Sequence, residues 1–96
     1  MLVAEGMRCR QEVEIVNTLG LHARAAAKLA QEAKTFHSSV SLKKNGNTAN
    51  AKSILDLLTL AATKGSRVEI LAEGEDAELA INALKGLIDR KFDEEP

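Results

Sequence analysis

The residues best suited to chemistry lie in the segment Gly20-Leu21-His22-Ala23-Arg24. A helical stripe of apolar residues begins directly after it, so His22 is expected where a loop meets the start of a helix. The first turn of a helix presents backbone N–H groups without helical partners, together with the positive end of the helix dipole. Such a position can hold a dianionic phosphoryl group. The segment therefore indicates an imidazole nucleophile beside a phosphoryl site.

Arg24 and three backbone amides complete this candidate site. We expect the amides of Ala23, Arg24 and Ala25 to contact phosphate oxygens, because they belong to the first helical turn. The guanidinium of Arg24 offers a permanently charged, planar pair of donors to the same oxygens. Gly20 lacks a side chain, and we expect it to let this loop approach a docking partner closely.

His22 has other possible roles, which the context makes weaker. A lone histidine is most often a surface residue that happens to begin a helix. A zinc site is poorly supported, since His37 is the only other imidazole and Cys9 lies on another expected element without ligand spacing. No serine or acid is paired with His22 in a triad motif. We expect neither a metal nor another cofactor.

Strand-like and helix-like patterns follow one another in the order βαββαβα. In chain order they predict strand 11–16, helix 22–34, strand 39–43, strand 48–51, helix 53–62, strand 68–72 and a last helix after residue 76. Three amphipathic helices and a sheet with one apolar face predict a two-layer α/β (α+β) sandwich.

The helix expected over 53–62 is too apolar to bury only one stripe. Its projection places Leu57, Leu60 and Ala61 on one arc, which we expect to face the core. Ile54, Leu55 and Leu58 form a neighbouring arc, which we interpret as a docking patch for a partner protein. The alternative is that every one of these side chains packs in the core.

Ser53 is expected to cap the start of this helix. Asp56 follows three residues later, which is the spacing of a capping box. Capping alone would explain the serine. Phosphorylation of Ser53 would add about two negative charges beside the docking patch and repel an acidic partner, so Ser53 is also a candidate regulatory site.

Composition restricts the protein class. The 96 residues suffice for one domain, expected over 10–96 after a flexible extension over 1–9. With 13 basic and 14 acidic side chains and only two aromatic residues, neither nucleic acid binding nor attraction to an anionic membrane is favoured. The single cysteine and the lack of a signal peptide or membrane span indicate the cytoplasm.

Two segments resemble the signature motifs of the HPr phosphocarrier family. Gly20-Leu21-His22-Ala23-Arg24 is similar to the family's active-site motif, and Ala51-Lys52-Ser53-Ile54-Leu55 is similar to its serine-site motif. The separation of the motifs and the order of elements also agree, from about Gln11 to Phe92. The resemblance therefore extends over nearly the whole chain.

The resemblance implies an open-faced sandwich, whose antiparallel sheet has the order 1-4-2-3 with the three helices on one face. It further implies that enzyme I of the phosphoenolpyruvate-dependent phosphotransferase system phosphorylates His22 at Nδ1, and that an enzyme IIA protein or domain receives the group. In relatives that meet an HPr kinase/phosphorylase, the serine matching Ser53 is regulatory. The chain would thus be a phosphoryl carrier and not an independent enzyme. Successive docking with different partners favours a monomer.

The sequence departs from the family at Ala25, where HPr proteins normally have proline. The segment Phe92-Asp93-Glu94-Glu95 and the pair Leu57-Leu58 look similar to the nitrogen-type branch, NPr. One alternative is therefore an NPr-like regulatory carrier. Another is a binding module with a ferredoxin-like or other α/β sandwich that docks through its second helix without phosphoryl chemistry. An RNA-binding α/β domain would need basic and aromatic residues on its sheet, which are missing.

Overall fold

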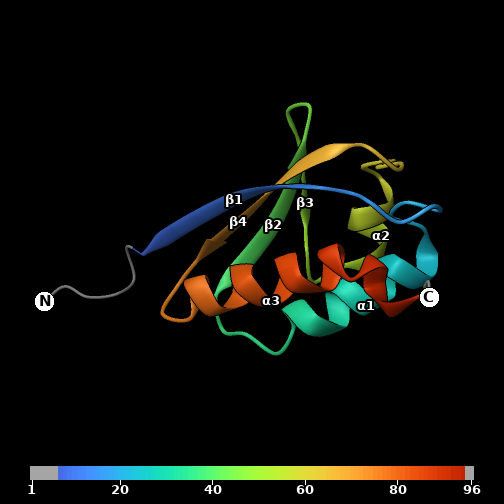
Figure 1. Cartoon of the computed structure of the whole chain (residues 1–96). Coiled ribbons are helices and arrows are strands. Elements are labelled where there is room, and N and C mark those ends of the chain that lie inside the picture. Colours follow the sequence, from blue (N-terminus) through green and yellow to red (C-terminus); the bar gives the residue numbers. More distant parts are fainter. Residues whose placement is uncertain (1–6, 95–96) are drawn as a thin grey trace, which may run out of the picture.

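The computed structural model describes residues 7–94, and its elements follow the expected order. They are β1 (Arg8–Glu14), α1 (Ala23–Ala33), β2 (Ser39–Lys44), β3 (Asn47–Asn50), α2 (Ile54–Leu58), β4 (Arg67–Glu73), α3 (Ala77–Asp89) and a short 3-10 turn, η2 (Lys91–Asp93). The strands form one antiparallel sheet of order β1-β4-β2-β3. The three α-helices lie on one side of it (Figure 1). The predicted open-faced sandwich is confirmed.

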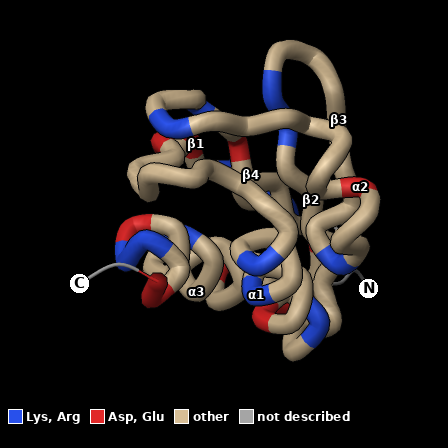
Figure 2. The backbone as a smooth tube through the Cα atoms, turned by 90° about the vertical axis from the view of Figure 1, so that its right-hand side faces the viewer, with Lys and Arg blue, Asp and Glu red and all other residues tan. Residues whose placement is uncertain are grey.

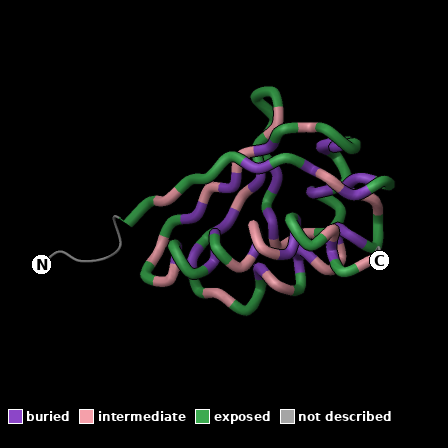
Figure 3. The backbone as a smooth tube through the Cα atoms, viewed as in Figure 1, coloured by how far each residue is buried: buried purple, intermediate pink, exposed green. Residues whose placement is uncertain are grey.

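The core lies between the sheet and the helices. Buried positions alternate along the strands and gather on the side that the helices cover (Figure 3). Because the chain has only two aromatic residues, this core consists mainly of aliphatic side chains. Its fully buried members include Leu29, Leu42, Leu57, Ile70, Leu84 and Ile88. Each such side chain stabilises the fold by roughly 1.5–3 kcal/mol through burial.

Strand β1 begins three residues earlier than expected. Arg8 pairs with Glu73, and Cys9 pairs with Ala72, so both belong to the sheet although the flexible extension was expected to reach residue 9. Cys9 also packs against the core, which continues the alternation of the strand. Residues 1–6 of the expected extension lie outside the described part of the chain.

Helix α2 is shorter than expected. It ends at Leu58, whereas the sequence predicted an end near residue 62. The amides of the next three residues donate to carbonyls three positions earlier, which is the hydrogen-bond pattern of a 3-10 turn and not of an α-helix. Ala61 then adopts φ 50°, which an α-helix does not allow. Leu57 and Leu60 are buried as predicted, whereas Ala61 is exposed, contrary to the prediction.

Within the described residues, no helix combines the length and the apolar character that crossing a bilayer would require.

Candidate functional site

His22 is the N-cap residue of α1. Its backbone is extended, with φ −81° and ψ −179°, and its carbonyl accepts the first helical hydrogen bond, from Ala26 N at 2.8 Å. The imidazole makes no capping hydrogen bond. The ring therefore lies at the start of the helix without capping it. The backbone amides of the first turn donate no hydrogen bond to the N-cap side chain.

The first turn of α1 opens onto a pocket of about 400 Å³. The pocket is lined by Leu19, His22, Ala23, Arg24 and Glu94. Ala25 is fully buried in the core, so only its backbone could contribute to the site. The structure thus brings His22 and Arg24 together at the helix N-terminus, where the positive end of the dipole favours an anion.

Arg24 is exposed and forms no ion pair with any residue between 7 and 94. Each of the other four arginines has an acidic partner: Arg8, Arg10, Arg67 and Arg90. The guanidinium of Arg24 is therefore free to bind an anion in the pocket without first breaking an internal contact.

Glu94 is a site residue that the sequence did not predict. Its Oε1 lies 2.9 Å from Nε2 of His22, and its side chain is only 7% exposed. This bond engages one ring nitrogen and leaves Nδ1 for chemistry. The two residues are 72 positions apart, and a carboxylate near the end of a chain is not a signal by itself. The start of α1 and the end of the described chain lie at the same end of the molecule (Figure 1).

Gly20 has a structural role that the sequence did not predict. It is buried with φ +67°, and an added Cβ would lie 2.6 Å from the carbonyl oxygen of Ala62. A glycine is therefore needed for the close approach to this chain's own 62–63 segment, and the contact of Gly20 with a docking partner stays a prediction. Asn17, a second residue missed from the sequence, fixes this loop because its Nδ2 donates to the carbonyl of Gly20 at 2.8 Å.

The predicted docking patch (Ile54, Leu55 and Leu58) is exposed. The exposed fractions of these side chains are 39%, 79% and 37%. Figure 2 looks onto this end of the molecule, where α2 carries a single acidic position and no basic one. Leu19, exposed by 69%, adds an apolar side chain at the His22 pocket. An apolar surface therefore exists beside the charged site, as the helical projection indicated.

Ser53 caps α2 as predicted. Its Oγ accepts a hydrogen bond from the amide of Asp56 at 3.2 Å. The other half of the expected capping box is missing, because the Asp56 carboxylate accepts from the amide of Asn50 at 3.0 Å and not from that of Ser53. The Ser53 amide instead donates to the carbonyl of Asn50. The acid thus ties α2 to the end of β3.

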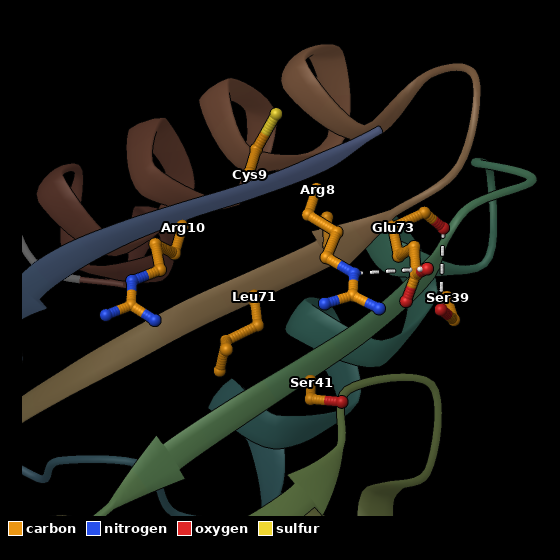
Figure 4. A pocket seen from close by; sticks show the side chains of 8 residues that line it. Arg8, Cys9, Arg10, Ser39, Ser41, Leu71 and Glu73 are labelled. Atoms are coloured by element: carbon orange, nitrogen blue, oxygen red, sulfur yellow. Dashed lines mark hydrogen bonds and ion pairs between the residues drawn. The ribbon is translucent and has the colours of Figure 1, made fainter. Parts of the chain in front are cut away.

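A second hollow, of about 360 Å³, lies on the helix-free face of the sheet (Figure 4). Arg8 and Arg10 reach into it, but their guanidinium groups lie 3.4 Å from Glu73 and 3.2 Å from Glu69, which balance their charge. The thiol of Cys9 points to the opposite side of the strand (Figure 4). This hollow therefore brings no nucleophile together with an unpaired cation, unlike the His22 pocket.

The fold and the His22 pocket together define a small α/β protein with a histidine and an unpaired arginine at a helix N-terminus, and comparison with known proteins agrees. Residues 9–90 match the family model described as "PTS HPr component phosphorylation site". The chain therefore belongs to the HPr phosphocarrier family.

Individual relatives support this assignment. The chain is 46% identical over 85 residues to the phosphocarrier protein HPr of Neisseria meningitidis, covering 88% of this chain and 96% of that protein. It is 41% identical over 87 residues to the phosphocarrier protein NPr of Shewanella violacea, covering 91% and 96%. The crystal structure of HPr-C-His from Thermoanaerobacter tengcongensis superposes with a TM-score of 0.87 at 43% identity, covering 92% and 99%.

Proposed function

We propose that this chain is a phosphoryl carrier, which accepts a phosphoryl group on His22 from phosphorylated enzyme I and donates it to an enzyme IIA protein or domain, in sugar uptake or its regulation. The observation that carries the proposal is the position of His22 at the N-cap of α1, in one pocket with Arg24. Membership of the HPr family supports it. One phosphoryl group is carried per chain, so the protein acts as a carrier and not as an independent enzyme.

The transfer step uses the ring nitrogen that Glu94 does not engage. The lone pair of His22 Nδ1 forms the new bond to phosphorus, while the bond between phosphorus and the donor breaks and its electron pair stays with the donor. Negative charge is spread over the three phosphoryl oxygens during transfer. Arg24 and the first-turn amides of α1 offset that charge. Donation to the acceptor is the same step in reverse, without a metal or other cofactor on this chain.

The test is incubation with enzyme I, magnesium and phosphoenolpyruvate, followed by intact-mass measurement before and after mild acid. We expect one acid-labile phosphoryl group on the wild type. It should be absent from His22→Gln and retained by His37→Gln, which replaces an exposed histidine elsewhere. Failure of the wild type to gain mass with an enzyme I from the same cell would contradict the carrier function.

The branch of the family is tested by the acceptor. The identity to an NPr and the Leu57-Leu58 pair favour a nitrogen-type regulatory carrier as the second candidate. The phosphorylated chain should be offered separately to a sugar-specific IIA protein and to a nitrogen-type IIA protein. The faster acceptor identifies the branch. If neither removes the phosphoryl group, a binding module without phosphoryl transfer becomes the better interpretation.

Ser53 is proposed as a regulatory phosphorylation site. Its hydroxyl lies at the start of α2, directly before the docking patch, so a phosphate there would place about two negative charges where partners are proposed to dock. Incubation with a cognate HPr kinase/phosphorylase and ATP should label the wild type and not Ser53→Ala. Equal labelling of the two proteins would contradict this role.

The proposal also covers the setting in which the carrier works. We expect a cytoplasmic protein that binds no nucleic acid and does not insert into a membrane. We also expect a monomer, because the carrier must present one docking face to successive protein partners. Light scattering after size-exclusion chromatography should give the mass of a single chain. A dimer mass at micromolar concentration would contradict the monomer.

A further inference from the structure

Glu94 lies directly against the ring of His22 at the end of the described residues. Its Oε1 is 2.9 Å from Nε2, while its Oε2 is buried without a hydrogen-bond partner among the described residues. A buried carboxylate oxygen without a partner is unfavourable. The contact with His22 therefore needs an explanation beyond simple packing.

The turn η2 supplies the geometry that brings Glu94 to this position. Lys91, Phe92 and Asp93 all have left-handed backbone, with φ 59°, 57° and 58°. Residues other than glycine adopt this conformation only at an energetic cost, so the surrounding structure must stabilise it. Phe92 is fully buried, and its carbonyl accepts a hydrogen bond from Lys28 Nζ at 2.8 Å. Burial of the Phe92 side chain and the hydrogen bond from Lys28 thus hold the turn in place. Glu94 follows it directly.

We propose that Glu94 is a positioning residue for His22, which accepts the Nε2–H hydrogen bond and so fixes the neutral ring in the tautomer whose lone pair is on Nδ1. An ionised carboxylate can only accept hydrogen bonds, so Nε2 must be the protonated nitrogen in this contact. The inference rests on the proposed carrier function, because it assigns the nitrogen that forms the bond to phosphorus.

The same carboxylate fits the charge change that transfer would cause. When the Nδ1 lone pair forms the bond to phosphorus, the donor keeps the electron pair of the broken bond, and the proton stays on Nε2. The ring then carries positive charge, and the Glu94 carboxylate lies directly against it. Carboxylates that bind the second nitrogen of a reactive histidine orient the ring and stabilise its cationic form in this way. Glu94 acts on the ring through its contact with Nε2.

The tautomer can be measured without any partner protein. Long-range 1H–15N correlation spectra at about pH 9, above the range in which histidine rings usually titrate, distinguish Nε2–H from Nδ1–H. We expect the His22 ring of the wild type to be almost entirely Nε2–H. Glu94→Ala should give a mixture, and Glu94→Gln, which keeps an acceptor oxygen, should restore Nε2–H. Glu78→Ala removes an exposed acid in the first turn of α3 and should leave the ring unchanged.

The rate of phosphorylation by enzyme I provides the second readout. We expect Glu94→Ala to lower kcat/KM roughly tenfold and Glu94→Gln to recover it only in part, since the amide positions the ring without supplying charge. Glu78→Ala should match the wild type. A wild-type ring found as Nδ1–H, or a Glu94→Ala variant with unchanged tautomer and rate, overturns the inference.

The two readouts separate this inference from the proposed function. If enzyme I fails to phosphorylate the wild type while the tautomers change as expected, the carrier function is wrong and the positioning of the ring by Glu94 stands. If the wild type is phosphorylated and Glu94→Ala alters neither readout, only the role of Glu94 is wrong.

Discussion

Lys28 Nζ donates a hydrogen bond to the backbone carbonyl of Phe92 at 2.8 Å. The bond joins the second turn of α1 to η2. One lysine therefore connects the helix that begins at His22 with the turn that precedes Glu94, and the geometry of the site depends on a contact between two distant parts of the chain.

Removing this link should destabilise the protein and loosen the site. Lys28→Met keeps an apolar stem and loses the donor. A hydrogen bond with a charged donor contributes about 1.5–3 kcal/mol, and the partial exposure of Lys28 places the expected loss in free energy of unfolding at about 1 kcal/mol. Urea denaturation measures it. Lys34→Met, at an exposed position after α1, is the control, and an equal free energy of unfolding for the two variants would contradict the link.

Gly20 should tolerate substitution far less than Gly65. Both have positive φ, +67° and +91°, which an alanine adopts at a cost of about 1–2 kcal/mol. An added Cβ at Gly20 would also lie 2.6 Å from the carbonyl oxygen of Ala62, whereas at Gly65 nothing lies within 4 Å. Urea denaturation should give Gly20→Ala at least twice the loss in free energy of unfolding of Gly65→Ala. Equal losses would show that the loop moves aside without cost.

Acid should weaken the contact between Asp76 and the start of β2. The Ser38 hydroxyl, helped by the amide of His37, lowers the pKa of Asp76 from 3.8 to about 2. The folded-state pKa lies below the unfolded one, so this stabilisation is present above about pH 4 and is lost as the pH falls towards 2. Asp76→Asn lacks the titration. The difference in free energy of unfolding between wild type and Asp76→Asn should be constant near neutrality and shrink below about pH 4.

That difference isolates Asp76, because all other acids titrate in both proteins. Urea denaturation at a series of pH values measures it. A gap that stays the same from neutral pH down to about pH 2 would mean that the contact with Ser38 does not depend on the charge of Asp76.

Local patterns predicted the parts of the fold and site that depend on neighbouring residues. The alternation of β4 and the cap of α2 are of this kind, and so is the position of His22, because an N-cap is defined within one turn of its helix. The sheet order came only from the family resemblance, since periodicity does not say which strands pair.

Contacts between distant residues explain what the sequence did not reveal. Glu94 reaches His22 only because the buried Phe92 stabilises a left-handed turn that no local pattern indicates. The close approach of Gly20 to Ala62 was not predicted, because Ala62 is 42 positions further along the chain. The helix α2 ends early because Ala61 turns left-handed, and Ala62 then accepts the amide of Leu21 at 2.8 Å.

The docking patch is tested by placing a charge on it. Leu55 is 79% exposed, so Leu55→Lys should leave the free energy of unfolding almost unchanged. If enzyme I docks on this surface, the lysine must be desolvated there, and kcat/KM for phosphorylation should fall roughly tenfold, equivalent to about 1.4 kcal/mol. Leu79→Lys is the matched control, because Leu79 is 65% exposed on α3, outside the patch. Equal kcat/KM values for the two variants would rule out docking through Leu55.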